Sequence, residues 1–331
     1  MSKAVAASGL LQDLWDDNEA ATLEDKPLEL LRYRSNLLGA DLRITNFGGG
    51  NTSSTFDLPD PVTGRVARVL AVKGSGGDLR SIGTAGFAIL YLEKLHQLID
   101  RYRGEAHEDE MVSYYPLCAF GDNRVASSID TTLHAFLPFD HVDHLHPDWA
   151  IALAASANGD KRLAEFNEEY GRQLIWVPWQ RPGFELALML RQAVESHPGC
   201  DGIVLGGHGL FTWGHTQRAC YASSIRTIDQ MGDFIDQRRR AAGRPPFGGS
   251  AVSAQAEGMS SAARAPDQQG LPFPGRPLAG LPEAGHPRDF RPRRFLLRGP
   301  DQLMEVLERI DRNALRQQDR QDQMQHAPLA A

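Results

Sequence analysis

The chain has 331 residues, of which 41% are hydrophobic and 23% charged, and its formal net charge is -7. This composition is typical of a globular protein with one large domain or two modest ones. The acidic balance and the lack of a basic face argue against a nucleic-acid-binding protein, and no apolar run is long enough for a membrane-spanning helix.

The cysteines and the N-terminal residues bear on the compartment. Only three cysteines occur, and none forms a Cys-x-x-Cys pair, so the sequence predicts neither a disulfide framework nor a cysteine zinc site. Asp13 follows the first apolar residues too closely for a secretory signal peptide. We therefore expect a cytoplasmic protein.

The first half of the chain is predicted to contain two helices and a hairpin. Apolar residues recur at helical spacing over residues 27–38. Two strand-like runs follow at 53–57 and 65–72, and the Pro-, Asp- and Gly-rich stretch between them predicts a hairpin turn. Residues 84–99 carry Phe and Leu at helical spacing, which predicts the second helix.

The second half mixes helices and strands without regular alternation. Ser128 is predicted to cap a helix over residues 129–136. The later predicted elements are a strand carrying His144 and His146, a helix at 149–158, a strand at 174–177, a helix at 185–196, strands at 202–205 and 210–213, and a helix at 216–240. This irregular order favours an α/β fold with a central mixed or antiparallel sheet flanked by helices.

Composition divides the chain into three parts. Of the 20 prolines, 11 lie from Pro245 onward. We expect residues 250–331 to be a Pro- and Arg-rich, partly disordered tail with one helix near 303–315. Residues 1–27 are expected to be an N-terminal extension, and residues 28–249 a single domain.

The sequence His144-Leu145-His146 is the strongest chemical signal. Side chains alternate along a strand, so both imidazoles share one face, with Cα atoms ~6–7 Å apart. A third histidine, His208 in a Gly-His-Gly sequence, would complete a zinc site with an open coordination position, which is typical of catalysis. The alternative is that the histidines are purely structural, as such pairs often are.

Three short polar segments have the chemistry of an anion pocket. Residues 49–52 and 74–77 are glycine-rich turns, whose backbone N–H groups can approach a phosphate. Ser127 and Ser128 stand at a predicted helix N-terminus, which favours negative charge. The alternative for each segment is an ordinary turn.

These motifs occur in a recognisable order along residues 28–249: Gly-Gly-Asn-Thr-Ser, Gly-Ser-Gly-Gly, Ser-Ser-Ile-Asp-Thr-Thr-Leu-His, His-Val-Asp-His-Leu-His-Pro and Gly-His-Gly-Leu. In this order they resemble the class II aldolase/adducin family. The likeness is greatest to the aldolase half of bifunctional rhamnulose-1-phosphate aldolase/short-chain dehydrogenase proteins. The resemblance implies a class II aldolase-like single domain, and it fades after residue 249.

The resemblance also implies the site residues. Family members bind zinc through three histidines, and His144, His146 and His208 match those ligands. The residues that match the family's phosphate pocket are Asn51, Ser75, Gly76, Ser127 and Ser128.

Asp130 falls near the family's catalytic acid/base. In single-domain members a Glu follows the Ser pair directly, whereas Ile129 intervenes here, and alignment on His134 returns Asp130 to that position. The resemblance therefore implies that Asp130 is the acid/base. The alternative is a carboxylate on the helix surface, paired with His134 four residues later.

The activity implied is that of a class II aldolase, dependent on Zn²⁺ or another divalent metal. Such an enzyme cleaves a ketose 1-phosphate, such as rhamnulose 1-phosphate, to dihydroxyacetone phosphate and an aldehyde through a metal-stabilised enediolate. The implied partners are a phosphorylated sugar and further copies of the chain in a homotetramer. The alternatives are a sugar-phosphate 4-epimerase of the same fold and a non-catalytic adducin-head-like module, which would lack the metal histidines.

Overall fold

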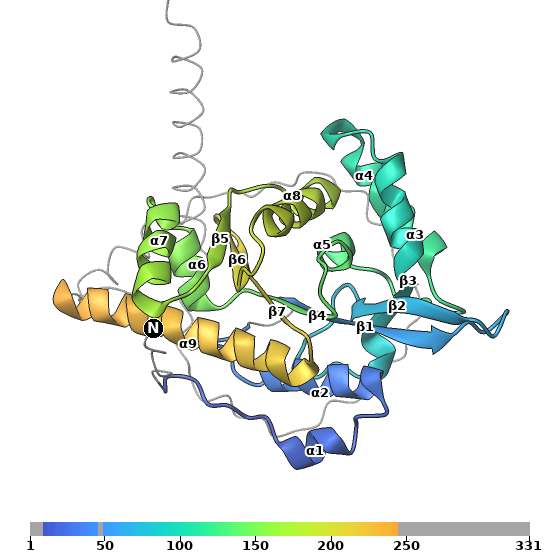
Figure 1. Ribbon diagram of the computed structural model, residues 1–331, viewed down its shortest axis with the longest axis horizontal. Coiled ribbons are helices and arrows are strands. Elements are labelled where there is room, and N and C mark those ends of the chain that lie inside the picture. Colours follow the sequence, from blue (N-terminus) through green and yellow to red (C-terminus); the bar gives the residue numbers. More distant parts are fainter. Residues whose placement is uncertain (1–8, 46–48, 244–331) are drawn as a thin grey trace, which may run out of the picture. The chain divides into compact units, whose positions relative to one another are not determined.

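The computed structural model describes residues 9–45 and 49–243 (Figure 1). The expected tail at 250–331 and its helix near 303–315 lie outside the described residues, as do residues 46–48. No helix in the described ranges is long and apolar enough to cross a membrane.

A seven-stranded sheet organises these residues, with the strand order β3-β2-β1-β4-β7-β6-β5. β5 and β6 are parallel, and the other neighbouring pairs are antiparallel. The expected mixed α/β fold is therefore confirmed. The strands are β1 (Asn51–Pro59), β2 (Val66–Lys73), β3 (Phe87–Tyr91), β4 (His141–Leu145), β5 (Leu174–Val177), β6 (Gly202–Leu205) and β7 (Gly209–Gly214).

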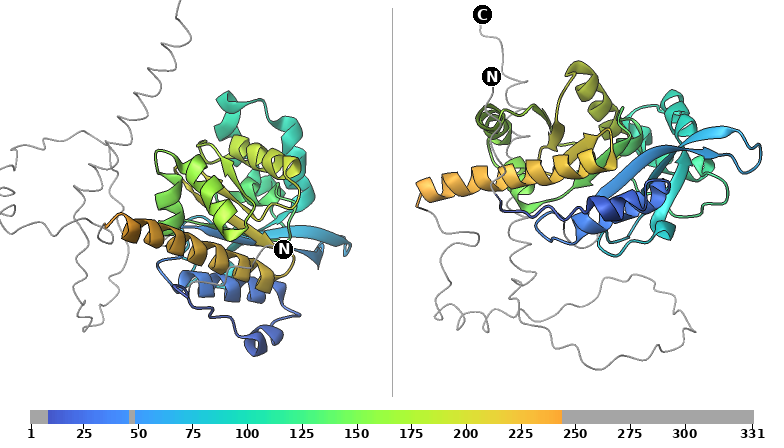
Figure 2. Two further views of the ribbon diagram at one scale, coloured as in Figure 1. Left: turned by 60° about the vertical axis from the view of Figure 1, so that its left-hand side comes forward. Right: turned by 60° about the horizontal axis from the view of Figure 1, so that its bottom comes forward.

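Helices cover both faces of the sheet (Figure 1 and Figure 2). One face packs against α3 (Leu92–Gln97), α4 (Glu108–Val112), α5 (Thr131–Ala135) and α8 (Phe184–Ser196). The other face packs against α2 (Pro27–Gly39), α6 (Asp148–Ala154), α7 (Gly159–Tyr170) and α9 (Gln217–Ala241). Short 3-10 turns are η1 (Thr84–Gly86), η2 (Leu98–Arg101), η3 (Glu105–His107) and η4 (Tyr115–Cys118). The apolar core of the described residues therefore lies on both faces of the sheet, in three clusters, the smallest of which is formed by Leu31, Ala71, Ile82 and Phe87.

The segment before α2 packs against the domain. The backbone N–H of Leu11 donates to Asp229 Oδ1 (2.8 Å), and that of Leu14 donates to the Tyr221 hydroxyl (3.1 Å). The ring of Trp15 lies against Tyr33, with the centroids 5.2 Å apart. Residues 9–16 thus cross the surface of α9, and α1 (Asp17–Ala21) follows.

The helix predicted at 84–99 is wrong in its first half. Phe87–Tyr91 forms the edge strand β3, and α3 begins only at Leu92. An apolar run this short fits a strand or a helix equally well, and the unpaired edge of β2 decides the outcome. β3 pairs with that edge of β2, and Leu70 stands opposite Leu90.

Three further helix assignments need correction. The helix predicted at 149–158 ends at Ala154, the last residue of α6. α5 begins at Thr131 rather than 129, because the Ser128 hydroxyl first accepts the backbone N–H of Asp130 (3.2 Å) in a local turn. The α7 helix (Gly159–Tyr170) was not predicted. Its apolar face is narrow and therefore hard to detect in the sequence. The buried residues are Gly159, Leu163, Phe166 and Tyr170. The hairpin and the elements predicted from residue 174 to 240 match the structure within two residues.

Many strand ends meet at one edge of the sheet. Asn51, the first residue of β1, stands opposite His144 near the end of β4, and Leu145 stands opposite Leu210 near the start of β7. β2, β5 and β6 end at this same edge. The loops that leave it carry the glycine-rich turns and His208.

Candidate metal centre

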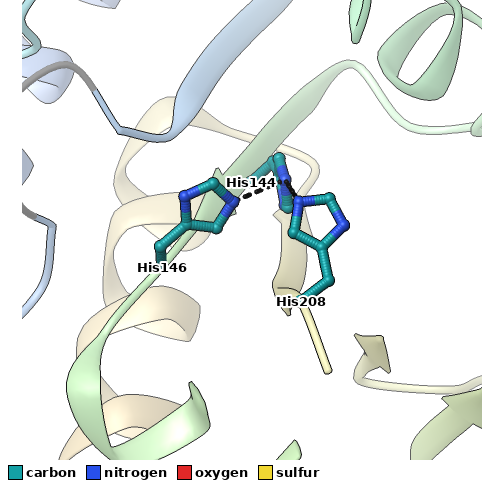
Figure 3. A group of neighbouring side chains, drawn as sticks. All are labelled: His144, His146 and His208. Carbon is teal, nitrogen blue, oxygen red and sulfur yellow. Dashed lines mark hydrogen bonds between the residues drawn. The ribbon is translucent and has the colours of Figure 1, made fainter. Parts of the chain in front are cut away.

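The three histidines come together at this edge (Figure 3). His144 Nε2 lies 3.1 Å from His146 Nε2 and 3.3 Å from His208 Nε2. Two nitrogens bound tetrahedrally to one zinc ion at 2.0–2.1 Å would lie about 3.3–3.4 Å apart. The observed separations fit such an ion, and within residues 9–45 and 49–243 the triad is the one cluster of three or more His, Cys, Asp or Glu side chains that could hold a metal ion.

Each ring is fixed by a different part of the backbone. His144 lies in β4, where its ring stacks on Phe211 with the centroids 4.2 Å apart. Its Nδ1 donates to the Leu210 carbonyl oxygen (3.2 Å), which leaves the lone pair of Nε2 facing the other two rings. His146 lies directly after the strand, and His208 lies in the turn between β6 and β7.

Glycine makes room for the rings. A Cβ atom on Gly209 would lie 2.7 Å from Cδ2 of His146 and 3.3 Å from Cε1 of His144. Gly207, on the other side of His208, has a φ of 67°, which favours glycine. The Gly-His-Gly sequence is therefore a packing requirement of the triad.

The triad is held in the neutral form that a metal ion needs. Burial lowers the pKa of His146 to about 4 and that of His144 well below its ordinary value. Burial also lowers the pKa of His208. Three neutral imidazoles with converging lone pairs form a donor set suited to a divalent ion.

A buried ion pair lies behind the metal strand. Arg34 Nε is 3.2 Å from Asp143 Oδ1, and both side chains are fully buried. Asp143 precedes His144 and points to the opposite face, where Ser224 Oγ also donates to it (2.8 Å). This pair ties α2 and α9 to the strand that carries the histidines.

The three polar segments also converge. The backbone N–H of Ser75 donates to the Ala126 carbonyl (2.9 Å), which joins the second glycine-rich turn to the segment before Ser127 and Ser128. Asn51 Nδ2 donates to the Lys73 carbonyl (3.4 Å), so the first turn adjoins the second. Gly76 lies in that second turn with a φ of 78°.

The first turn also lies against the metal strand. A Cβ atom on Gly50 would be 2.9 Å from the His144 carbonyl oxygen. The polar turns and the triad therefore share one end of the fold, although they come from distant parts of the sequence.

Asp130 lies where α5 begins and is not paired with His134. Its Oδ2 accepts a hydrogen bond from Ser128 Oγ (3.3 Å). His134 Nδ1 is instead within 2.8 Å of Ser53 Oγ. Burial raises the pKa of Asp130, while Ser128 and Lys73 oppose the shift. The alternative of a surface Asp–His pair is therefore wrong.

Lys73 is a candidate site residue that the sequence analysis missed. Its side chain is only 3% exposed at the end of β2, and no hydrogen bond or ion pair to another described residue engages its Nζ. Burial lowers its pKa, and the charges of Asp130 and Asp78 oppose the shift. Its own charge reaches the triad, since it contributes to the lowered pKa of His146. Its position directly before Gly-Ser-Gly was the available signal.

Comparison with known proteins establishes the family. The sequence model of the Class II Aldolase and Adducin N-terminal domain matches residues 32–227. The chain belongs to the class II aldolase and adducin family. The resemblance inferred from the ordered motifs is thereby confirmed.

Two relatives agree with this membership. The chain is similar to the "Uncharacterized oxidoreductase YuxG" of Bacillus subtilis (strain 168), with 40% identity over 229 residues, or 69% of this chain. Those residues make up 32% of that relative, so this chain spans about a third of its length. It also resembles the N-terminal class II aldolase domain of a conserved protein from Thermoplasma acidophilum, with 29% identity and a TM-score of 0.59. That match covers 68% of this chain and 99% of the other.

Proposed function

We propose that this chain is a divalent-metal-dependent class II aldolase. In this proposal Zn²⁺, or a similar ion, binds to His144, His146 and His208. The substrate is a ketose 1-phosphate such as rhamnulose 1-phosphate, and the products are dihydroxyacetone phosphate and an aldehyde. The observation that carries the proposal is the juxtaposition of three neutral imidazoles with Lys73, a buried cation that lacks a partner among the described residues.

The metal and the phosphate pocket divide the work of binding. A divalent ion bound by the triad supplies a Lewis acid for the ketose carbonyl. Lys73 provides positive charge for the phosphate, which would accept a charge-assisted hydrogen bond from its Nζ. The remaining proposed phosphate contacts are Asn51, Ser75, Gly76, Ser127 and Ser128. Together they hold the substrate so that its carbonyl reaches the metal centre.

Asp130 is proposed to move the proton. When the C3–C4 bond breaks, the C4 hydroxyl loses a proton, C4 becomes the aldehyde carbon, and C3 must gain a proton. Burial raises the pKa of Asp130, which brings it nearer to the range useful for proton transfer at neutral pH. The hydrogen bond from Ser128 orients the carboxylate within the pocket.

Product analysis separates the aldolase from the alternatives. Metal-loaded protein is incubated with a panel of ketose 1-phosphates and, separately, with pentulose 5-phosphates. We expect dihydroxyacetone phosphate to be released from the first group. Conversion of the second group to C4 epimers, without release, would instead support the epimerase. No turnover of either group would support a binding module.

A histidine control sharpens the assay. His208→Ala should lose dihydroxyacetone phosphate release together with bound metal. His141→Ala is the matched control, because His141 lies in the same strand as His144 but is within 2.9 Å of Ser54 Oγ and outside the triad. Equal activity in both variants would contradict the proposed metal site. We further propose a homotetramer, which sedimentation analysis of the full chain tests.

A further inference from the structure

The loop between β5 and α8 presents an exposed tryptophan. Trp179 is 66% exposed, and it is the one aromatic side chain among the large hydrophobic residues that are exposed in the described parts of the chain. Its ring makes no aromatic or cation–π contact with another described residue. Tryptophan is enriched at interfaces with other molecules, because its ring offers a large apolar area together with a polar N–H.

Trp179 lies against the turn that carries the third histidine. A Cβ atom on Gly207 would be 3.4 Å from Cδ1 of Trp179, and one on Gly206 would be 3.2 Å from the backbone nitrogen of Trp179. Both glycines directly precede His208. The indole therefore adjoins the β6–β7 turn that carries His208.

The loop around Trp179 is held in place by its neighbours. The backbone N–H of Gly206 donates to the Val177 carbonyl oxygen (2.8 Å), which fixes the start of the loop. Gln180 Nε2 donates to Glu105 Oε1 (2.8 Å), and Arg181 forms an ion pair with Asp109. The two residues after Trp179 are thus occupied, and the indole alone is left available.

The strand order determines the order in which the parts of the proposed site follow one another across the sheet. The phosphate pocket is built at the ends of β1 and β2, the triad at β4 and the β6–β7 turn, and Trp179 follows β5. A substrate with its phosphate at Lys73 and its carbonyl at the metal extends its remaining carbons toward Trp179.

We infer that Trp179 is a specificity-determining residue that packs against the part of the ketose released as the aldehyde. This inference rests on the proposed aldolase function. An indole face contacts C–H and methyl groups rather than charges. The favoured substrates are therefore those whose aldehyde half ends in an apolar group, such as a methyl group.

The aldol condensation separates the two halves of the substrate. Metal-loaded wild type, Trp179→Ala and Trp179→Phe are assayed with dihydroxyacetone phosphate and either lactaldehyde, which carries a methyl group, or glycolaldehyde. For Trp179→Ala we expect the KM for lactaldehyde to rise about 10-fold, the size of effect that one methyl contact in an apolar pocket produces. The KM for dihydroxyacetone phosphate should stay unchanged, and Trp179→Phe should recover most of the loss.

The controls distinguish the possible failures. Val66→Ala removes a similarly exposed apolar side chain at the opposite end of β2 and should change neither KM. Unchanged lactaldehyde KM in Trp179→Ala, or an equal rise for both aldehydes, would overturn the inference and leave the aldolase proposal standing. Lack of condensation by the wild type would overturn the proposed function and this inference with it.

Discussion

Replacing Lys73 with methionine tests the phosphate pocket and the energetics of the fold together. Lys73 is 3% exposed, and no hydrogen bond or ion pair to another described residue engages its Nζ. Lys73→Met keeps the length of the side chain and removes its charge. We expect this change to weaken substrate binding and to stabilise the protein, a combination that a purely structural lysine would not show.

The two magnitudes follow from the burial of the charge. A hydrogen bond to a charged group contributes about 1.5–3 kcal/mol. Because each 1.36 kcal/mol corresponds to a factor of ten, the KM for the ketose 1-phosphate should rise about 10- to 150-fold. The Nζ of Lys73 is not fully enclosed, and the charges of Asp130 and Asp78 partly offset its burial, so removal of the charge should raise the free energy of unfolding by only about 1 kcal/mol.

The pH dependence of stability gives an independent check. Since burial lowers the pKa of Lys73 below 10.5, the unfolded chain binds more protons than the folded one between the two pKa values. The destabilisation is fully present below the folded-state pKa and disappears as the pH rises through it toward 10.5. The stability advantage of Lys73→Met should therefore shrink with rising pH.

Denaturant unfolding at several pH values and steady-state kinetics measure these effects. Lys94→Met serves as the control, because Lys94 is an exposed lysine in α3. Lower stability of Lys73→Met than of wild type at pH 7, with an unchanged KM, would refute the reasoning. That result would mean that the folded protein supplies a partner for Lys73 and that the phosphate binds elsewhere.

Three further changes test other parts of the site. Asp130→Asn should lower kcat by ~10²–10⁴-fold while metal analysis shows unchanged content, because only proton transfer is lost; near-normal turnover would remove Asp130 from the mechanism. Ser128→Asp should raise the KM by repelling the phosphate, and kinetics with an unaltered KM would place the phosphate elsewhere. Asp143→Ala leaves Arg34 buried without its counter-charge and should lower the free energy of unfolding by about 3–5 kcal/mol, measured by denaturant titration; a loss below 1 kcal/mol would contradict the buried pair.

Local sequence pattern was sufficient for the central strands and the triad. The alternation in His144-Leu145-His146 predicts that both rings share a face, and the structure has them together with His208.

Tertiary context decided that β3 is a strand and not a helix. The run Phe87–Tyr91 fits either element type, and only the open edge of β2 makes it a strand.

The local sequence pattern could not predict the surroundings of Lys73 and Asp130. A lysine at the end of a strand is ordinarily exposed, and the burial of Lys73 comes from segments distant in sequence. The inserted Ile129 left the position of Asp130 in question. In the structure Ile129 is 38% exposed, while the Asp130 carboxylate accepts a hydrogen bond from Ser128. The insertion is thus accommodated by a turn that directs the apolar side chain outward.

The central claim is that His144, His146 and His208 bind one divalent ion. Anomalous diffraction at the zinc absorption edge, from crystals of the zinc-loaded chain, tests it most directly. The account predicts one strong peak per chain at the triad, about 2.0–2.1 Å from each of the three Nε2 atoms. A zinc peak bound elsewhere, with no density among these three rings, would contradict it.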